Sequence, residues 1–397
     1  MRIAIFSDTW LPNINGVTFS IINEIKALEN QHDFLLFVPK TQKQALGFKI
    51  DCPTYEITGF DLPTYPGYRI SLPCSRKLKK AIKQHQIDFL HIQSPFSLGY
   101  YGLLAKKLLR VPSVATFHTW LSEYVGHLTG GFKEELVKEL LEKPTWKYTR
   151  WFYGLNEVVI TPSRMLEREM KRWGIKKASA VPNSISPVFF QQKNRKEQVV
   201  AFKKKFSIPL DKTVLLYVGR ISFEKRLETL LEAYKSLENT NYGKKLFLVV
   251  VGDGPHLDHY KKLAVSLGLK NYVFTGYWAH QNLPVVYAAG DIFAAPSDTE
   301  TQGLTYIEAM ASGVLVIGTK AGGVVDYIKH GHSGLLVKER NPVEFEKMIA
   351  FALENEAEMA VIKRNAAKIA ENYSYKGFRR NMNAVFKRAL DTFVEST

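Results

Sequence analysis

The chain has 397 residues, and its 54 Lys and Arg against 38 Asp and Glu give a formal net charge of +16 at pH 7. This length usually exceeds one hydrophobic core, so we expect two domains, while 46% hydrophobic and 23% charged residues exclude a disordered chain. The two cysteines, Cys52 and Cys74, form no CxxC pattern, no signal peptide precedes Asp8, and no apolar run could span a bilayer, so we expect a reducing, cytoplasmic location.

Short apolar runs alternate with helical patterns along the whole chain, which predicts parallel α/β units. The expected strands lie at 3–6, 34–38, 88–92, 114–117 and 158–161 in the first half, and at 214–218, 246–251, 272–275, 292–295 and 315–317 in the second. They predict two Rossmann-like, doubly wound domains at 1–195 and 196–375, with a Lys-rich linker at 191–205 and a ligand cleft between the domains. A last helix, within 376–397, should cross back over the domain junction to the first domain.

Two residues of the first half follow predicted strands, where doubly wound sheets bind ligands. Gly16 precedes a helix expected at about 17–28 and would let a phosphate approach its backbone NH, although a simple turn glycine is the alternative. His118 follows the strand at 114–117 and would contact a sugar or a leaving group, although a lone histidine is more often structural.

A basic helix is expected at 75–83, with Leu78 and Ile82 on one side. Its positive charges are Arg76, Lys77, Lys79, Lys80 and Lys83. Each basic residue near an anionic surface contributes about 1 kcal/mol, so this helix could dock on a membrane; a solvated helix face is the alternative. The aromatic segment 132–153 fits either a core or a membrane contact.

Arg220 and Lys225 follow the strand at 214–218 and precede a helix. The guanidinium of Arg220 can contact phosphate oxygens in bidentate fashion, whereas Lys225 supplies a compact charge. Together they would neutralise most of a diphosphate. A salt bridge from Lys225 to a nearby glutamate is the structural alternative.

Glu300 and Glu308 are separated by a turn at Gly303 and the start of a helix at 304–311. The free NH groups of such a helix start attract anions, so a phosphate could lie between the two acids, with one glutamate on a sugar and the other on a ribose. Surface acids on a solvated helix are the alternative. No DxD pair or metal-ligand cluster is present, so we expect no metal cofactor, and no GxSxG or P-loop motif indicates a hydrolase or kinase.

Together these motifs resemble the retaining GT-B glycosyltransferases of family four, in the same order along nearly the whole chain. The run Glu300-Thr-Gln-Gly-Leu-Thr-Tyr-Ile-Glu308, together with 91–99 and 117–124, resembles bacterial 1,2-diacylglycerol 3-α-glucosyltransferases. The resemblance implies a GT-B fold and roles for eight site positions of this chain.

By this resemblance, the backbone NH of Gly16 and the side chains of Arg220 and Lys225 bind the donor diphosphate, and Glu308 binds the ribose. Glu300, with the backbone of Gly303 and Leu304, binds the donor sugar and distal phosphate, and His118 contacts the transferred sugar near the reaction centre. The catalytic residues would be His118, Glu300, Arg220 and Lys225. Cations and helix-start NH groups would stabilise the leaving group in place of a metal.

The implied activity is transfer of glucose from UDP-glucose to diacylglycerol, with retention, at the cytoplasmic face of the cell membrane. The alternatives are another donor sugar, or another acceptor such as phosphatidylinositol, a monoglycosyl lipid or a soluble molecule. A nucleic-acid binder is a third hypothesis, which the absence of any known nucleic-acid-binding module disfavours. One departure concerns the acceptor: Ser184 and Ser186 occupy a stretch in which relatives commonly carry glycine.

Overall fold

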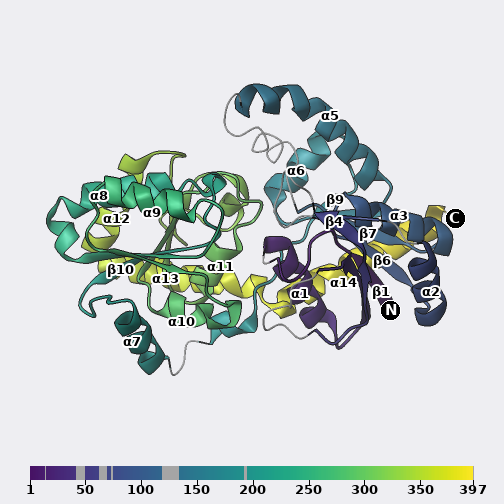
Figure 1. Cartoon of the computed structure of the whole chain (residues 1–397), viewed down its shortest axis with the longest axis horizontal. Coiled ribbons are helices and arrows are strands. Elements are labelled where there is room, and N and C mark those ends of the chain that lie inside the picture. The colour runs from purple at the N-terminus through teal and green to yellow at the C-terminus, as the bar shows by residue number, and fades with distance from the viewer. Residues whose placement is uncertain are drawn as a thin grey trace. The chain divides into compact units, whose positions relative to one another are not determined.

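The computed structural model describes residues 1–13, 15–41, 50–61, 69–72, 75–118, 134–191 and 195–396. Two compact units are present, one made of Met1–Ser184 with Tyr375–Thr397 and the other of Ile185–Ser374. Each unit contains a parallel sheet with helices on both faces (Figure 1). This architecture confirms the predicted α/β class with two doubly wound sheets.

The first unit is built on a seven-stranded sheet in the order β3-β2-β1-β6-β7-β8-β9. Its strands are β1 (Arg2–Phe6), β2 (Asp33–Pro39), β3 (Thr54–Ile57), β6 (Phe89–Ile92), β7 (Ser113–Thr116), β8 (Val158–Thr161) and β9 (Ala178–Ala180). A separate antiparallel pair joins β4 (Gly59–Asp61) to β5 (Arg69–Ser71). The helices are α1 (Gly16–Leu28), α2 (Ser75–His85), α3 (Ser97–Leu109), α5 (Glu134–Gly154), α6 (Arg164–Arg172) and α14 (Tyr375–Ser396).

Alternating side chains of β1 show how both faces of this sheet are covered. Ile3 and Ile5 pack in one cluster with apolar residues of α1 and α14, whereas Ala4 and Phe6 pack in another with residues of α2 and α3. Because helices cover both faces, the central strands are continuous apolar runs, and that is the signal by which they were predicted.

The second unit has a six-stranded parallel sheet in the order β12-β11-β10-β13-β14-β15. Its strands are β10 (Thr213–Val218), β11 (Leu246–Val251), β12 (Tyr272–Gly276), β13 (Ile292–Ala295), β14 (Leu315–Thr319) and β15 (Leu335–Val337). Its α-helices are α7 (Lys196–Lys205), α8 (Leu227–Glu238), α9 (Leu257–Ser266), α10 (Leu283–Ala288), α11 (Leu304–Ala311), α12 (Pro342–Glu354) and α13 (Glu356–Ala370). Short 3-10 helices are η1 (Pro187–Phe190), η2 (Phe223–Lys225), η3 (Asn241–Lys244), η4 (His280–Asn282), η5 (Gly322–Asp326) and η6 (Glu371–Tyr373).

All ten predicted strands are present, with ends that differ by one or two residues. The sequence had not indicated β3, β4, β5, β9 and β15. These strands have three or four residues each, and β9, with the sequence Ala-Ser-Ala, carries no apolar run. Short strands without an apolar run lack the pattern on which prediction relies.

The stretch expected to be the linker contains helix α7, and Phe202 of this helix lies in the core of the second unit. Phe189, in η1, is buried in the same core. These two aromatic side chains explain why the chain enters the second unit at Ile185, whereas the sequence suggested a boundary at 195. Because most residues of α7 are charged or polar and only Phe202 is buried, the sequence pattern did not indicate this helix.

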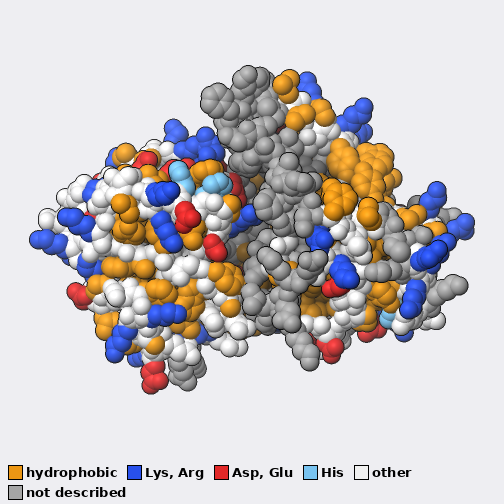
Figure 2. Space-filling view, in the orientation of Figure 1, with side chains coloured by type: hydrophobic (Ala, Val, Ile, Leu, Met, Phe, Trp, Pro, Cys, Tyr) orange, Lys and Arg blue, Asp and Glu red, His pale blue; other side chains and the backbone are white. Residues whose placement is uncertain are grey.

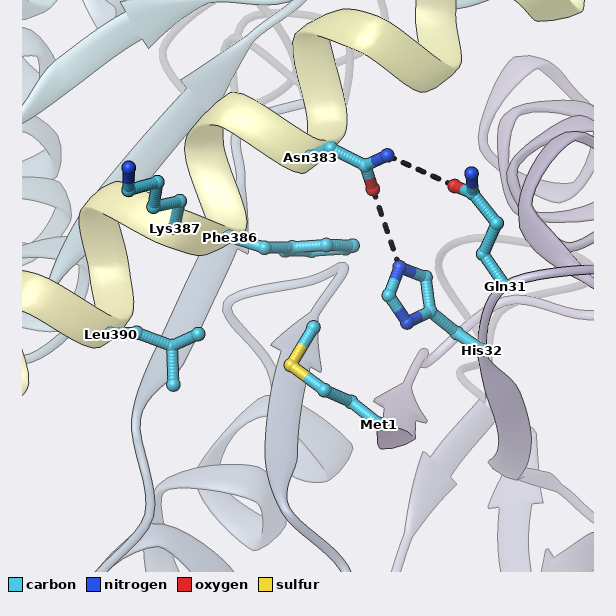
Figure 3. Close-up of a pocket in the computed structure, with 7 residues that line it drawn as sticks. All are labelled: Met1, Gln31, His32, Asn383, Phe386, Lys387 and Leu390. Carbon is cyan, nitrogen blue, oxygen red and sulfur yellow. Dashed lines mark hydrogen bonds between the residues drawn. The ribbon is translucent and has the colours of Figure 1, made fainter.

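Helix α14 packs in the first unit, where Phe378, Met382 and Phe386 join the cluster of α1. Asn383 Nδ2 donates to Gln31 Oε1 at 2.9 Å, and His32 Nε2 lies 3.3 Å from Asn383 Oδ1 (Figure 3). With Met1, Phe386, Lys387 and Leu390, these residues line a depression of about 460 Å³. Along the described part of the chain, no helix has both the length and the apolar character to cross a bilayer.

Candidate functional site

Lys225 and Glu300 form an ion pair in the second unit. Lys225 ends η2, after β10, and Glu300 lies in the loop after β13, the strand that pairs with β10. Because both loops leave the carboxyl ends of adjacent parallel strands, they meet, and Lys225 Nζ lies 2.7 Å from Glu300 Oε1. The salt bridge considered as the structural alternative for Lys225 is therefore present.

The charge of Lys225 is maintained by its surroundings. Burial lowers the pKa of its ammonium, but the carboxylates of Glu300 and Glu224 outweigh burial and raise that pKa overall. For Glu224 burial acts in the opposite direction and raises the pKa of the carboxyl. Hydrogen bonds from the Ser222 hydroxyl and from the backbone of Glu224, together with the charges of Lys225 and Arg220, outweigh burial and lower that pKa overall. Two cations and two carboxylates thus occupy one edge of the sheet, and the side chain of Arg220 is exposed there.

The turn at Gly303 requires glycine. Its φ of 81° lies in the left-handed region, and a Cβ would lie 2.9 Å from the ring of Tyr306. Tyr327 OH donates to the carbonyls of Gln302 at 2.7 Å and of Gly303 at 3.0 Å. Leu304 then begins α11, so the predicted helix start and its glycine are confirmed.

Gly322 and Gly323 support the same loop from the far side. A Cβ on Gly322 would lie 2.4 Å from the carbonyl oxygen of Glu300, and one on Gly323 would lie 2.2 Å from that of Thr301. The NH of Gly323 donates to the carbonyl of Glu300 at 2.7 Å. Gly322 and Gly323 were not among the predicted site residues, although a Gly-Gly pair closely following a strand is a signal for a turn.

Glu308 is buried within α11, with 5% of its surface exposed. Tyr287 OH donates to its Oε2 at 2.8 Å, and His280 Nε2 lies 3.3 Å from its Oε1. Burial, with the negative charge of Glu308, raises the pKa of Tyr287 far above its usual value. A solvated helix face is therefore excluded, and because a carboxylate has about four acceptor positions, capacity remains for further donors.

In the first unit, His118 belongs to a chain of hydrogen bonds that reaches α1. His118 Nε2 lies 2.5 Å from Gln93 Oε1, and Gln93 Nε2 donates to Glu24 Oε2 at 2.9 Å. Glu24 Oε1 lies 2.6 Å from His91 Nδ1, and His91 Nε2 lies 2.6 Å from Thr116 Oγ1. No sequence pattern indicated this chain of hydrogen bonds, because its members come from α1 and from the ends of β6 and β7, which only the fold brings together.

This hydrogen-bond chain determines the state of His118. A carboxylate only accepts, so Gln93 must turn its amide NH₂ toward Glu24 and its oxygen toward His118. Nε2 of His118 is then the donor, and Nδ1 is the acceptor. Burial, followed by the charge of His91, lowers the pKa of His118 to about 3, so the ring is neutral near pH 7.

Gly16 is the first residue of α1, and nothing lies within 4 Å of the position that a Cβ would occupy. Asn15 caps the helix, accepting from the NH of Thr18 at 3.0 Å and donating to Thr9 Oγ1 at 2.8 Å. The space beside Gly16 fits an approaching ligand but also fits the simple turn glycine, so its role stays a prediction.

The stretch 183–186 passes from the first unit into the second, and its first two residues, Asn183 and Ser184, are buried in the first. Ser20 Oγ donates to Asn183 Oδ1 at 2.6 Å, and Asn23 Nδ2 donates to the carbonyl of Ser184 at 3.0 Å. Ser184 is 1% exposed. The stretch is therefore attached to α1 by hydrogen bonds, and the role of Ser184 and Ser186 at an acceptor stays untested.

The basic helix is present as α2, in which Leu78 and Ala81 are buried and Arg76, Lys79 and Lys80 are exposed. The side chains of Lys77 and Lys83 lie outside those that the structure describes. Within the described residues, no group of three or more His, Cys, Asp or Glu side chains could hold a metal ion.

The structure thus distributes the predicted site residues over both units. Gly16 and His118 lie in the first, each after a strand of the same sheet. The basic residues of α2 lie in the first unit as well. Arg220, Lys225, Glu300, Gly303, Leu304 and Glu308 lie in the second, where Lys225 pairs with Glu300 and Glu308 accepts a hydrogen bond from the buried Tyr287. Prediction missed Glu24, Gln93, His280, Tyr287 and Tyr327.

Comparisons with known families and proteins agree with this arrangement. Residues 14–188 match the family described as Glycosyltransferase Family 4, and residues 199–369 match Glycosyl transferases group 1. The chain is 28% identical to an alpha-monoglucosyldiacylglycerol synthase of Acholeplasma laidlawii over 98% of both chains. It is 31% identical to the synthase of that name from Streptococcus pneumoniae, over 80% of this chain and 70% of the relative. It is also 29% identical to a GDP-mannose-dependent alpha-mannosyltransferase of Corynebacterium glutamicum, over 89% of this chain and 80% of the relative.

Solved structures share the fold. The sucrose-phosphate synthase of Thermosynechococcus elongatus superposes with a TM-score of 0.77 at 19% identity, over 98% of each chain. The Anabaena protein HepE, solved with UDP and glucose, superposes with a TM-score of 0.74 at 19% identity, over 98% of this chain and 99% of its own. The two domain matches and these relatives show that the chain belongs to glycosyltransferase family 4 and is a glycosyltransferase with the GT-B fold.

Proposed function

We propose that this glycosyltransferase moves glucose from UDP-glucose to diacylglycerol, with retention of the anomeric configuration, as a peripheral protein on the cytoplasmic face of the cell membrane. The observation that carries the proposal is the ion pair of Lys225 and Glu300 beside the glycine start of α11. The similarity to alpha-monoglucosyldiacylglycerol synthases supports the acceptor and the sugar.

In this proposal, Lys225 and Arg220 bind the diphosphate of the donor. Lys225 is suited to this role because neighbouring carboxylates raise its pKa and keep it charged despite burial. The NH of Leu304, at the start of α11, adds the positive end of a helix dipole near the distal phosphate. Negative charge that develops on the leaving group is stabilised by these groups, and no metal is required.

The two glutamates take different ends of the donor. Glu300 accepts from hydroxyls of the sugar, and its 2.7 Å contact with Lys225 fixes its position beside the phosphates. Glu308 accepts from the ribose with the acceptor positions that Tyr287 and His280 leave. Substitution of Glu300 should therefore lower turnover without changing nucleotide affinity, whereas substitution of Glu308 should weaken nucleotide binding.

The first unit supplies the acceptor side and the reaction centre. His118 is held neutral with Nδ1 as an acceptor, so it can receive a hydrogen bond from a hydroxyl of the transferred sugar. The backbone of Gly16 contacts the diphosphate from this unit. The acceptor attacks on the face from which the nucleoside diphosphate leaves, and the departing phosphate takes the acceptor proton.

Incubation of the purified protein with radiolabelled UDP-glucose and anionic liposomes, with and without diacylglycerol, tests the proposal. Label should enter the lipid phase only when diacylglycerol is present, and alkaline methanolysis followed by α-glucosidase digestion should release labelled glucose. Labelled GDP-mannose serves as the control donor. Absence of labelled lipid with UDP-glucose and diacylglycerol would refute the proposed reaction.

The alternative is a family 4 transferase with another donor sugar or acceptor. Similarity to a GDP-mannose-dependent alpha-mannosyltransferase over most of the chain supports this alternative. The same assay separates the two proposals, because transfer from GDP-mannose, or to phosphatidylinositol in place of diacylglycerol, identifies the alternative directly.

A further inference from the structure

One side of helix α3 presents large apolar side chains outward. Phe96, Tyr100, Leu104 and Leu108 follow one another at intervals of four residues, and between 37% and 49% of each is exposed. This spacing puts them on one side of the helix. Such a stripe usually faces a core, so its exposure requires an explanation.

The inner side of α3 combines two large buried side chains, Leu98 and Tyr101, with the small residues Gly99, Gly102 and Ala105. A Cβ on Gly99 would lie 1.9 Å from the carbonyl oxygen of Ser94, and one on Gly102 would lie 2.9 Å from Ile92. The helix therefore lies close against the sheet through its glycines. Because Leu98, Tyr101 and the close glycine contacts already fill the inner side, no space is left there for the four outer side chains.

Helix α5 extends this exposed apolar surface. Trp151 is 51% exposed and Leu155 is 44% exposed. The ring of Trp151 lies 5.8 Å from that of Tyr100, and Lys106 Nζ of α3 donates to the carbonyl of Leu155 at 2.6 Å. Figure 2 shows hydrophobic side chains gathered where Figure 1 draws α3 and the adjoining part of α5. We call Phe96, Tyr100, Leu104, Leu108, Trp151 and Leu155 the α3–α5 surface.

The exposed charges around this surface are all positive. Among residues 96–110 and 140–155, the exposed charged side chains are Lys107, Arg110, Lys143, Lys147 and Arg150. Glu142 is half-buried in this stretch, and Glu157, just beyond it, pairs with Lys106 at 2.7 Å. A rim of Lys and Arg matches the negative headgroups of anionic lipids, whereas a protein interface is usually depleted in Lys.

We propose that the α3–α5 surface inserts into the interfacial layer of an anionic membrane and supplies the apolar part of membrane attachment. Trp and Tyr place an apolar ring and a polar edge at the boundary between headgroups and acyl chains, and leucines extend beyond them. The basic rim contacts the headgroups. This surface differs from α2, whose described exposed side chains at 76–85 are basic or polar.

The inference rests on the proposed action at a membrane, and it assigns two separable contributions to membrane binding. Attraction between α2 and anionic lipids weakens with salt, because ions screen it. Burial of the α3–α5 surface does not weaken with salt in this way. Substitutions in the α3–α5 surface should therefore weaken membrane binding at every salt concentration. Substitutions in α2 should instead reduce the dependence of membrane binding on salt.

Co-sedimentation with vesicles of phosphatidylcholine and phosphatidylglycerol tests this assignment. The variant Leu104→Gln/Leu108→Gln/Trp151→Gln should bind at least about ten-fold more weakly at every salt concentration, with the salt dependence of the wild type. The variant Arg76→Gln/Lys79→Gln/Lys80→Gln should reduce the salt dependence. Leu210→Gln, which changes a side chain 59% exposed in the second unit, is the matched control and should leave binding unchanged.

Two further measurements keep the outcomes distinct. Melting curves establish that each variant folds, and vesicles with brominated acyl chains should quench the wild type more than Trp151→Phe. Unchanged vesicle binding in the folded Leu104→Gln/Leu108→Gln/Trp151→Gln variant would overturn the proposal. It would also be overturned if this variant lost self-association of the protein but kept vesicle binding, because the surface would then be an interface between copies of the chain. Transfer to diacylglycerol in detergent micelles tests the reaction apart from membrane binding, so the reaction can fail while the attachment surface stands.

Discussion

Glu300 is the residue for which turnover and binding should separate most clearly. We expect Glu300→Gln to lower kcat by about a hundred-fold or more, as loss of one stabilising group at a reaction centre does, while UDP affinity changes little. Gln can still accept a hydrogen bond from Lys225, so the cation keeps a partner. The measurements are steady-state kinetics and UDP titration calorimetry.

The control for this substitution is Glu358→Gln, an exposed acid on α13. It should alter neither quantity. An equal loss of turnover and UDP affinity in Glu300→Gln would instead place Glu300 at the nucleotide, contrary to the role proposed for it.

Glu308 should affect both stability and nucleotide affinity. Glu308→Ala leaves the buried hydroxyl of Tyr287 without its acceptor, which costs about 1–3 kcal/mol of unfolding free energy. Loss of a charged acceptor for the ribose should also weaken UDP binding by about ten-fold or more. Urea denaturation and UDP titration measure the two effects.

Tyr287→Phe separates these two effects, since it removes the hydroxyl and keeps the carboxylate. It should lower stability by about 1 kcal/mol and leave UDP affinity within about two-fold. A ten-fold loss of UDP affinity in Tyr287→Phe would show that affinity follows the packing around Glu308 and not its contact with ribose.

The neutral ring of His118 should make the free energy of unfolding of the first unit fall as the pH is lowered. Its pKa is about 3 in the folded chain against an ordinary 6.5, so the unfolded chain takes up a proton first as pH falls. Stability from this group is complete above pH 6.5 and declines between 6.5 and 3. The difference in melting temperature between the wild type and His118→Gln should therefore shrink as pH is lowered from 7 to 4.5.

The control for the pH series is His259→Gln, at an exposed histidine of α9. Its difference from the wild type should stay constant over the same range. If the difference for His118→Gln grew as pH fell, the folded state would bind the proton more tightly than the unfolded state, and the assignment of a neutral ring would be wrong.

At the scale of elements, α14 is the most informative helix. Phe386 is 1% exposed in the first core, and its ring lies 5.0 Å from that of Phe89. We expect Phe386→Ala to destabilise the first unit by about 3–5 kcal/mol, as for other buried aromatic residues. Val394→Ala, on the same helix but 72% exposed, should have no measurable effect.

This prediction is checked by chemical denaturation followed with probes in each unit. The first unit's transition should move to lower denaturant concentration, and the second unit's transition should move less. Movement of both transitions by the same amount would mean that the units unfold together and that α14 does not stabilise the first unit selectively.

The elements that sequence could predict are those whose burial is written into a local pattern. Continuous apolar runs identified ten strands, Gly303 indicated the start of α11, and the run of helix formers after it indicated the length of that helix. β9 and α7 lacked such a pattern. The position of β9 depends on its pairing with β8, and that of α7 depends on one buried side chain, Phe202. In the site, the Lys225 and Glu300 loops could be predicted from their positions after strands, whereas Glu24 and Gln93 could not, because only the fold brings their side chains to His118.

At the scale of the whole molecule, the nucleotide should stabilise one unit more than the other. The ribose and diphosphate contacts proposed for UDP lie mostly in the second unit, so at a hundred times its dissociation constant UDP should stabilise that unit by about 2.7 kcal/mol. Scanning calorimetry should show the second unit's transition rising while the first unit's changes less. Loss of the shift in Glu308→Ala would support the assignment, and a larger shift in the first unit would contradict it.

The return of α14 to the first unit has a consequence for synthesis on the ribosome. Residues 1–184 are translated first, yet the cluster around β1 and α1 includes Phe378, Met382 and Phe386 from the end of the chain. The second unit contains none of these late residues and can complete its core while the first still lacks a helix. The part of the protein that is made first is thus completed only when residues 375–396 have been synthesised, and until then its apolar surface is open to aggregation.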